Sequence, residues 1–279
     1  MTYETLCHRL TACYEAGEAK ALVRWVLDVR FGLSLADILC GKVTQLSADD
    51  QAELEKIMNR LEKGEPVQYI IGIADFAGRQ FHVAPGVLIP RPETAELCEW
   101  VVSKAKHASQ LLDIGTGSGC IAISLAADLA HAQVSAWDIS DDALRIARDN
   151  ATKHGVNVTF EKHDILDTST STSAQSVYDI IISNPPYIKP SERDGMAQNV
   201  LNYEPDIALF APADNPIIFY QKIGDFASKH LKNGGHLFFE LNPLTAEAVG
   251  DYLRQLGFSK IEFRRDIFGK QRFLKATKI

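Results

Sequence analysis

The chain has 279 residues, of which 46% are hydrophobic and 23% charged, a balance typical of a globular protein with one large domain or two unequal ones. Its 36 acidic residues outnumber its 29 basic ones, which gives a formal net charge of -7 at pH 7. Because a protein that binds nucleic-acid backbone needs many Lys and Arg side chains to displace counterions, this charge disfavours naked DNA or RNA as the main partner.

Cysteine usage and the length of apolar runs bear on metal binding and location. The five cysteines are an odd number and none forms a CxxC pair, so neither a zinc site nor a disulfide framework is indicated and no metal is expected. No long apolar run follows Glu4 and Arg9, which argues against a secretory signal. No stretch of about 18 apolar residues occurs, which argues against a membrane span. We therefore expect a cytoplasmic protein.

The first 65 residues are expected to form a small helical domain. Apolar residues recur at helical spacing between positions 6 and 14 and again between positions 22 and 29. A third helix is predicted to follow Ser47, which is suited to the N-cap, and to end before Gly64. A bundle of this size is too small to hold an enzyme, but it is suited either to binding a substrate protein or to a purely structural role.

A larger domain is predicted from residue 87 to the C-terminus, joined to the helices by a β-hairpin connector at residues 66–86. In the larger domain short apolar runs alternate with helices, one of them between Ser140 as N-cap and Gly155. The alternation predicts an α/β fold with a mostly parallel sheet covered on both faces, whose last two strands form an antiparallel hairpin at the edge. A run of Thr and Ser at residues 168–173 is expected to be an exposed loop. The predicted strands are residues 111–113, 134–138, 158–160, 180–183, 237–241, 261–263 and 272–274.

A glycine-rich turn follows the first predicted strand and precedes a helix, which is the context of a nucleotide-binding loop. Glycines permit the tight turn and let a ligand approach the backbone closely. The third glycine of the dinucleotide fingerprint would fall on Cys120, so the loop fits NAD or FAD poorly. The candidate cofactor-binding residues of this loop are Gly115, Thr116, Gly117, Ser118 and Gly119.

Two acidic residues follow the next strands of the predicted sheet. Asp138 ends the second strand, where a carboxylate can accept hydrogen bonds from both ribose hydroxyls, although it is also placed to cap the helix that begins at Asp141. Asp164, after the third strand, is positioned to reach the amino group of an adenine. A ligand with an adenosine ribose but without a pyrophosphate fits both the loop and Asp138, which predicts S-adenosylmethionine as the cofactor.

The tetrad Asn184-Pro185-Pro186-Tyr187 follows the fourth strand, at the carboxyl edge of the sheet, where open α/β folds bind ligands. Its prolines fix two φ angles and remove two N–H donors, so the turn is rigid. The Asn184 side-chain oxygen and the Pro185 carbonyl can each accept a hydrogen from a substrate NH2 group, while Tyr187 offers a flat face to a planar amide or base. Two such acceptors favour a pyramidal nitrogen whose lone pair points at a methyl group. Asn184, Pro185 and Tyr187 are therefore the predicted catalytic residues.

With these motifs, the sequence resembles the HemK-type release factor glutamine methyltransferases from about residue 18 to the C-terminus. The likeness rests on the segment GEPVQYI at residues 64–70, the segment PRPET at residues 90–94, the glycine loop and the tetrad. The tetrad alone is shared with DNA adenine methyltransferases, so the PRPET segment and the helical N-terminus distinguish the two families. Further residues that fit the family are Tyr203, Glu204, Pro205, Glu240, Asp266, Gly269 and Arg272.

The resemblance implies a seven-stranded, Rossmann-like class I methyltransferase sheet and an enzyme that uses S-adenosylmethionine. The implied substrate is the side-chain amide nitrogen of the glutamine in the Gly-Gly-Gln motif of class 1 translation release factors. Residues 115–119, Asp138 and Ile165 would contact the cofactor and Asn184 both cofactor and substrate, while residues 185–187 bind the glutamine. Two departures from the family are visible, because Ile165 stands where a Trp is common and Asn242 follows Glu240 and Leu241 where a Gly and then a Gln are usual.

Three other functions are compatible with the residues. Glutamine in a ribosomal protein could be methylated with the same tetrad, and adenine N6 methylation of nucleic acid uses it too. The acidic balance and the lack of an extra base-reading domain disfavour the nucleic-acid substrate. A binding module that kept the cofactor fold without catalysis is disfavoured by Asn184 and Asp138, and a cofactor-turnover assay would distinguish it.

Overall fold

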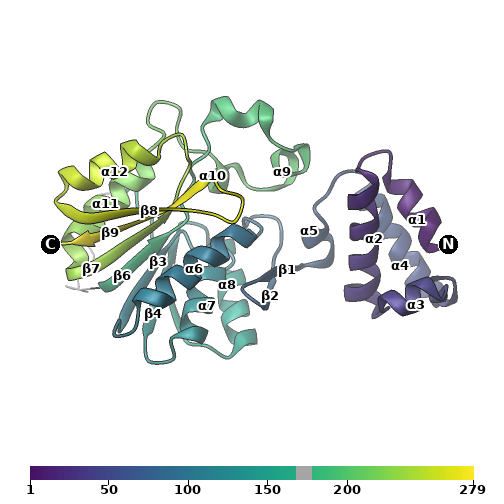
Figure 1. Cartoon of the computed structure of the whole chain (residues 1–279). Helices are drawn as coiled ribbons and strands as arrows, with labels where there is room; N and C mark the ends of the chain where they lie inside the picture. The colour runs from purple at the N-terminus through teal and green to yellow at the C-terminus, as the bar shows by residue number, and fades with distance from the viewer. Residues whose placement is uncertain (168–177) are drawn as a thin grey trace. The chain divides into compact units, whose positions relative to one another are not determined.

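The structure, a computed structural model, describes residues 1–167 and 178–279, so the Thr- and Ser-rich run at residues 168–173 lies outside the described residues. The chain divides into two compact units (Figure 1). The N-terminal unit consists of Met1–Ile73 and Ala197–Tyr203, and the larger unit of Ala74–Met196 and Glu204–Ile279.

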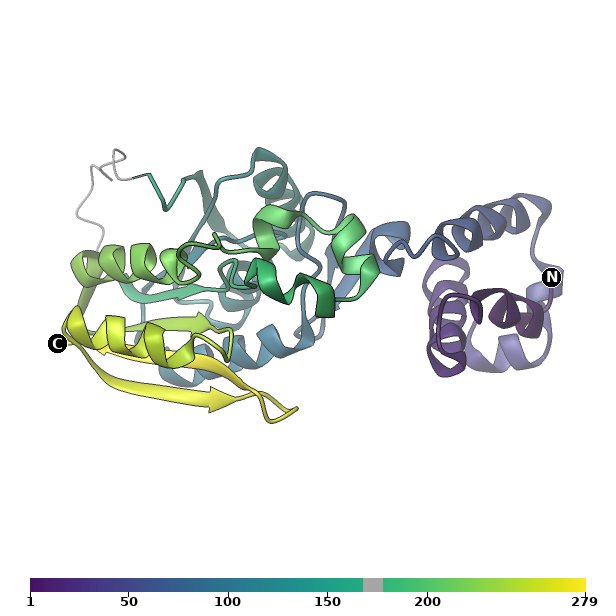
Figure 2. The same cartoon turned by 90° about the horizontal axis from the view of Figure 1, so that it is seen from above.

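In the N-terminal unit, the helices between residues 3 and 71 surround one apolar core (Figure 2), whereas the short helix at residues 198–203, which belongs to the same unit, has no buried residue. Ser47 caps the fourth helix as expected, because its hydroxyl accepts a hydrogen bond from the Asp50 N–H. Tyr14 lies beyond the first helix, and its phenol donates to the Leu61 carbonyl at 2.9 Å. The elements are α1 Tyr3–Leu10, α2 Ala16–Phe31, α3 Leu35–Leu39, the 3-10 helix η1 Lys42–Gln45, α4 Ala48–Leu61, α5 Val67–Ile71 and α9 Gln198–Tyr203.

The segment expected to be a β-hairpin connector, residues 66–86, differs from that expectation in its first part. Val67–Ile71 form the short helix α5, which starts after Pro66 and ends at Gly72 in the left-handed conformation. The hairpin itself is confined to β1 Ile73–Phe76 and β2 Arg79–His82. A single helical turn of apolar residues has too few positions to reveal its period, so the apolar runs suggested strands.

The seven-stranded sheet of the larger unit confirms the predicted architecture. Its order is β5-β4-β3-β6-β7-β9-β8, and the first five of these strands run parallel. The last two pair antiparallel at the edge seen in yellow in Figure 2. The strands are β3 Gln110–Ile114, β4 Gln133–Asp138, β5 Val158–Lys162, β6 Tyr178–Ser183, β7 Leu231–Glu240, β8 Phe258–Arg265 and β9 Gln271–Lys278.

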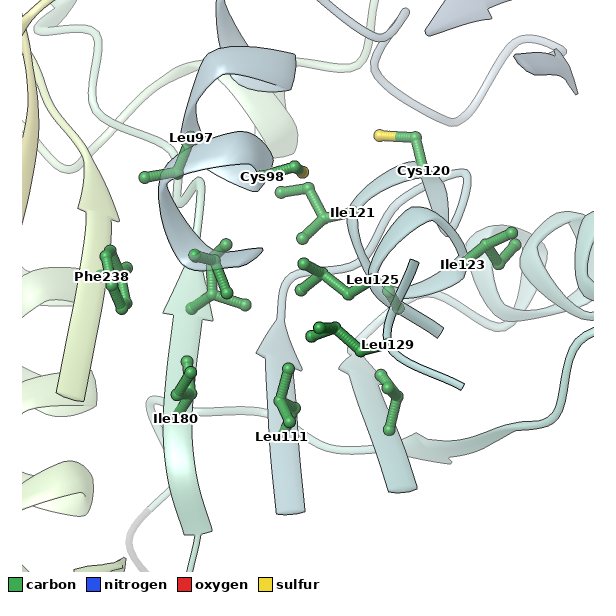
Figure 3. Packing of buried hydrophobic residues seen from close by; sticks show 14 of the residues in the cluster. Leu97, Cys98, Leu111, Cys120, Ile121, Ile123, Leu125, Leu129, Ile180 and Phe238 are labelled. Carbon is green, nitrogen blue, oxygen red and sulfur yellow. The ribbon is translucent and has the colours of Figure 1, made fainter. Parts of the chain in front are cut away.

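Helices cover both faces of this sheet, as buried parallel strands require. One face packs against α6 and α7, where Leu97, Ile121 and Leu125 meet the strand residues Leu111 and Ile180 (Figure 3). The other face packs against α11 and α12. The helical elements are α6 Pro92–Lys104, α7 Cys120–Asp128, α8 Asp141–His154, η2 Pro190–Gly195, α10 Asp206–Leu209, α11 Ile218–His230 and α12 Ala246–Gln255.

Strand order determines where a ligand can bind. Since β4 and β5 extend the sheet on one side of β3, and β6 and β7 on the other, the chain direction of the crossovers reverses beside β3. Ligands of open α/β sheets bind outside the carboxyl ends of the strands at such a switch point. Asp138 ends β4, and the glycine loop, Asp164 and Asn184 follow β3, β5 and β6, so the fold brings all four to this edge.

Candidate active site

A pocket of about 220 Å³ opens at the carboxyl edge of the sheet. Besides the predicted residues it includes segments that sequence reasoning missed, among them residues 86–88 before α6, His163 after β5, residues 207–208 in α10, and Phe219 and Ile223 in α11. These segments carry no local motif, and only the tertiary fold brings them to the pocket. The predicted site residues that line it are Gly115, Gly117, Asp138, Asp164, Ile165, Asn184, Pro185 and Pro186.

Part of the glycine loop shapes the turn and lies outside the pocket lining. The Thr116 hydroxyl donates to Asp113 at 2.7 Å, and Thr116 and Ser118 are both buried. A side chain at Gly119, where φ is +82°, would place its Cβ 2.8 Å from the Ile123 methyl carbon. Thr116 is thereby tied to the end of β3, and Gly119 allows close packing against Ala147 of α8, while Gly115 and Gly117 line the pocket.

The Asp138 carboxylate is fixed by two backbone donors. One oxygen accepts from the Gly117 N–H at 2.8 Å and the other from the Ser140 N–H at 2.9 Å. The N-cap of α8 is Ser140, whose hydroxyl accepts from the Ala143 N–H, so Asp138 is not the helix cap. Burial raises the pKa of Asp138. Each oxygen retains a lone pair for a further donor, as binding of two hydroxyls requires.

The segment after β5 gives the pocket a wall that is partly polar and partly apolar. Asp164 accepts from the Leu166 N–H at 2.8 Å, which fixes the carboxylate beside the pocket. His163 lies against Trp137 with ring centroids 4.2 Å apart. Ile165 gives this wall an aliphatic surface, where the family that the sequence resembles commonly has a Trp.

Asp113 is a buried acid directly before the glycine loop, and its second carboxylate oxygen has no hydrogen-bond partner among the described residues. Burial raises the pKa of Asp113 to about 7, against a usual value of 3.8. Because the folded-state pKa lies above the unfolded one, the carboxyl stabilises the fold below about pH 4, and this contribution is lost as the pH rises through 7.

Because Asp113 titrates, the substitution Asp113→Asn should change how the stability of the protein depends on pH. The amide is neutral at every pH, so the variant should gain stability relative to the parent between pH 4 and pH 8, by up to about 4 kcal/mol. Urea unfolding at both pH values measures this difference. A stability difference that is independent of pH would show that Asp113 does not titrate in this range.

The tetrad is connected to a buried acid at the end of β7. The Tyr187 hydroxyl donates to Glu240 at 3.0 Å, and the Thr94 hydroxyl donates to the other Glu240 oxygen at 2.6 Å. The Asn184 side-chain NH2 donates to the Thr94 oxygen at 3.4 Å. Burial, followed by the charge of Glu240, raises the pKa of Tyr187, so its phenol stays neutral. Tyr187 itself lies outside the pocket lining, packed against the core beside α11 and α12.

Further contacts hold the loops around the tetrad. The Asn242 NH2 donates to the Tyr187 carbonyl at 3.1 Å and to Glu192 at 2.7 Å. The side chain of Glu204 is 1% exposed, and it accepts from Arg91 at 2.6 Å and from the Ile89 N–H at 3.1 Å. The PRPET segment is thus attached to the loop after α9.

The sequence does contain a signal for Glu240, because this acid directly follows the apolar run Leu237, Phe238, Phe239.

Residues 1–167 and 178–279 contain no cluster of three or more His, Cys, Asp or Glu side chains able to hold a metal ion. No helix in this part of the chain is long and apolar enough to cross a membrane.

Comparison with known proteins identifies the family. Residues 4–72 match the PrmC N-terminal domain and residues 105–242 match a methyltransferase domain. The chain is 46% identical to the release factor glutamine methyltransferase of Bacteroides thetaiotaomicron over 265 residues, which are 95% of each protein. It is 37% identical to that of Flavobacterium psychrophilum, over 96% of this chain and 95% of the relative. A methyltransferase structure from Pyrococcus furiosus shares the fold, with a TM-score of 0.51 at 18% identity over 83% of this chain and 99% of that one. The chain therefore belongs to the family of release factor glutamine methyltransferases.

Proposed function

We propose that the protein transfers a methyl group from S-adenosylmethionine to the side-chain amide nitrogen of the glutamine in the Gly-Gly-Gln motif of class 1 release factors. The observation that carries this proposal is the placement of Asn184. Its side chain lines the pocket, and its NH2 group is directed to Thr94. The amide oxygen is thereby left as an acceptor for the substrate.

The pocket residues fit the cofactor. The two Asp138 oxygens suit the ribose hydroxyls, Asp164 suits the adenine amino group, and Ile165 provides an apolar contact for the base. Glycines 115 and 117 let the ligand approach the backbone, as a cofactor without a pyrophosphate needs. When bound, S-adenosylmethionine supplies an electrophilic methyl group on a sulfonium.

The tetrad residues act on the substrate amide. An amide nitrogen is a poor nucleophile, because its lone pair is conjugated with the carbonyl. The Asn184 oxygen and the Pro185 carbonyl accept its two hydrogens and favour a pyramidal nitrogen whose lone pair points into the pocket. Pro186 and Tyr187 form the rigid remainder of the turn that positions the glutamine. Orientation of this kind can lower a barrier by roughly 7–11 kcal/mol.

The substrate test compares proteins with labelled methyl donor. We expect label on a whole class 1 release factor, and none on a factor whose motif glutamine is changed to glutamate. A ribosomal-protein mixture and duplex DNA are the competing substrates. Preferential labelling of a ribosomal-protein glutamine, or of adenine in DNA, would overturn the release-factor assignment. Because the proposed substrate is a translation factor, we also propose that the enzyme acts in the cytoplasm.

The N-terminal helices are proposed to bind the release factor. This unit has a surface hollow of about 520 Å³, lined by apolar side chains such as Leu22 and Trp25 beside the charged Arg24 and Asp28. A short glutamine loop offers too small an interface to select one protein, so a second contact is needed.

Deleting residues 1–63 tests the role of these helices. We expect kcat/KM on the whole release factor to fall at least about tenfold, as the loss of an interface hot spot would cause. Activity on a short Gly-Gly-Gln peptide should change little, which also shows that the larger unit remains folded. Equal losses on peptide and whole factor would assign the helices to stability alone.

A further inference from the structure

Glu240 is a buried acid that is hydrogen-bonded to the tetrad through Tyr187 and is not among the residues that line the pocket. Its side chain ends β7 and is nearly inaccessible to solvent, with 2% of the residue exposed. Its two carboxylate oxygens accept from the hydroxyls of Thr94 and Tyr187. Thr94, on α6, is equally buried at 2% exposure. Burying a carboxyl group costs free energy unless its oxygens are hydrogen-bonded, and these two hydroxyls supply those hydrogen bonds.

The direction of each hydrogen bond in this chain follows from the chemistry of the groups. Both Glu240 oxygens act as acceptors, one from the Tyr187 hydroxyl and the other from Thr94, so the single hydroxyl hydrogen of Thr94 is donated to Glu240 at 2.6 Å. The Thr94 oxygen can then only accept from its other neighbour, the Asn184 side chain. The group of Asn184 that faces Thr94 at 3.4 Å must therefore be the NH2 group. The opposite orientation would set two oxygen acceptors against each other.

We propose that Glu240 and Thr94 are positioning residues that orient the Asn184 amide so that its oxygen, and not its NH2 group, faces the substrate nitrogen. The inference deepens the proposed function and rests on it. A reversed Asn184 would present two donors to the substrate NH2 group, which itself has only hydrogens to offer. The Tyr187 hydroxyl on the second Glu240 oxygen ties the other end of the tetrad to the same acid.

Two substitutions should break the relay in different ways. In Glu240→Gln, the new NH2 group can donate to Thr94, which frees the Thr94 hydrogen to point at Asn184 and reverses the side-chain amide. In Thr94→Val, an isosteric change removes the acceptor that holds the Asn184 NH2 group. Both variants should lower kcat for glutamine methylation by about 100-fold, comparable to the loss of one preorganised hydrogen bond at a reacting centre. KM and cofactor affinity should remain close to those of the parent.

Two matched variants separate orientation from packing. Thr94→Ser keeps the hydroxyl and loses a methyl group, so it should retain nearly the parent kcat. Tyr187→Phe removes the other hydrogen bond to Glu240 while leaving the Thr94 branch intact, so the Asn184 orientation should persist. Thermal unfolding without cofactor accompanies each assay, and Glu240→Gln should unfold no earlier than the parent because it removes a buried charge.

The side-chain amide of Asn184 can be observed directly by nitrogen NMR, independently of activity. In the parent and in Thr94→Ser, one NH2 hydrogen should exchange slowly with solvent, and in Thr94→Val and Glu240→Gln this protection should be lost. Unchanged protection in Thr94→Val and Glu240→Gln, or a parent-like kcat in both, would overturn the relay. An equal loss of kcat in Thr94→Ser and Thr94→Val would also overturn it, in favour of packing. A parent enzyme that methylates no glutamine would contradict the proposed function, while the NMR result still decides the orientation.

Discussion

Replacing Asn184 with alanine is expected to reduce single-turnover methyl transfer to glutamine by about 10²–10³-fold at saturating cofactor, while cofactor affinity is largely retained. The Asn184 oxygen is proposed to act on the substrate amide mainly at the transition state, so its loss should lower kcat and kcat/KM alike. The side chain is half-buried and donates one long hydrogen bond to Thr94, so its removal should leave the fold intact. Rapid-quench measurement of label transfer to a Gly-Gly-Gln peptide tests this.

The matched control for this variant is Asn157→Ala. Asn157 is exposed and precedes β5, at the amino edge of the sheet, away from the pocket. We expect it to transfer methyl groups at the parent rate. A single-turnover rate for Asn184→Ala equal to that of the control would remove Asn184 from the catalytic residues.

Replacing Asp138 with alanine is expected to weaken S-adenosylmethionine binding by at least about tenfold, since a hydrogen bond to a charged group contributes about 1.5–3 kcal/mol. The substitution removes the proposed acceptor for the ribose hydroxyls. It also removes the acceptor of the 2.8 Å hydrogen bond that the Gly117 N–H donates to Asp138, which should loosen the glycine loop. Titration calorimetry with the cofactor measures the change.

A nearby acid provides the control for Asp138. Asp141 opens α8, and 76% of its side chain is exposed, so Asp141→Ala should bind the cofactor like the parent. A second variant, Asp138→Asn, keeps the shape and one acceptor and should lose less affinity than alanine. If Asp138→Ala binds the cofactor as tightly as Asp141→Ala does, the ribose assignment is wrong.

Local sequence patterns predicted the parts of the site that lie next to strand ends. Asp138 and Asn184 could be placed because each directly follows an apolar run in a strand–turn–helix or strand–loop context. The cap of α8 was predicted at Ser140 because serine suits the N-cap position before a helix, and the structure confirms it. The seven strands and the antiparallel pairing of the last two could be predicted from the pattern of short apolar runs along the chain.

Contacts between distant segments could not be predicted in this way. Thr94 and Glu240 are 146 residues apart, and no spacing rule links a threonine in PRPET to an acid that ends a strand. The side chains of Thr116 and Ser118, two predicted cofactor residues, are buried, and their position between glycines does not reveal this direction. The five-residue helix α5 was too short to show a helical period.

Mass spectrometry of release factors from cells that lack this protein tests the central claim most directly. The peptide that carries the Gly-Gly-Gln motif should be about 14 Da lighter than in parent cells, which corresponds to the loss of one methyl substitution. Fragmentation of the parent peptide should assign the methyl group to the glutamine side chain. Purified protein with S-adenosylmethionine should restore the methyl group. The Asn184→Ala variant should fail to restore the methyl group. A motif glutamine that remains methylated in cells without the protein, or restoration of the methyl group at a different residue, would contradict the account.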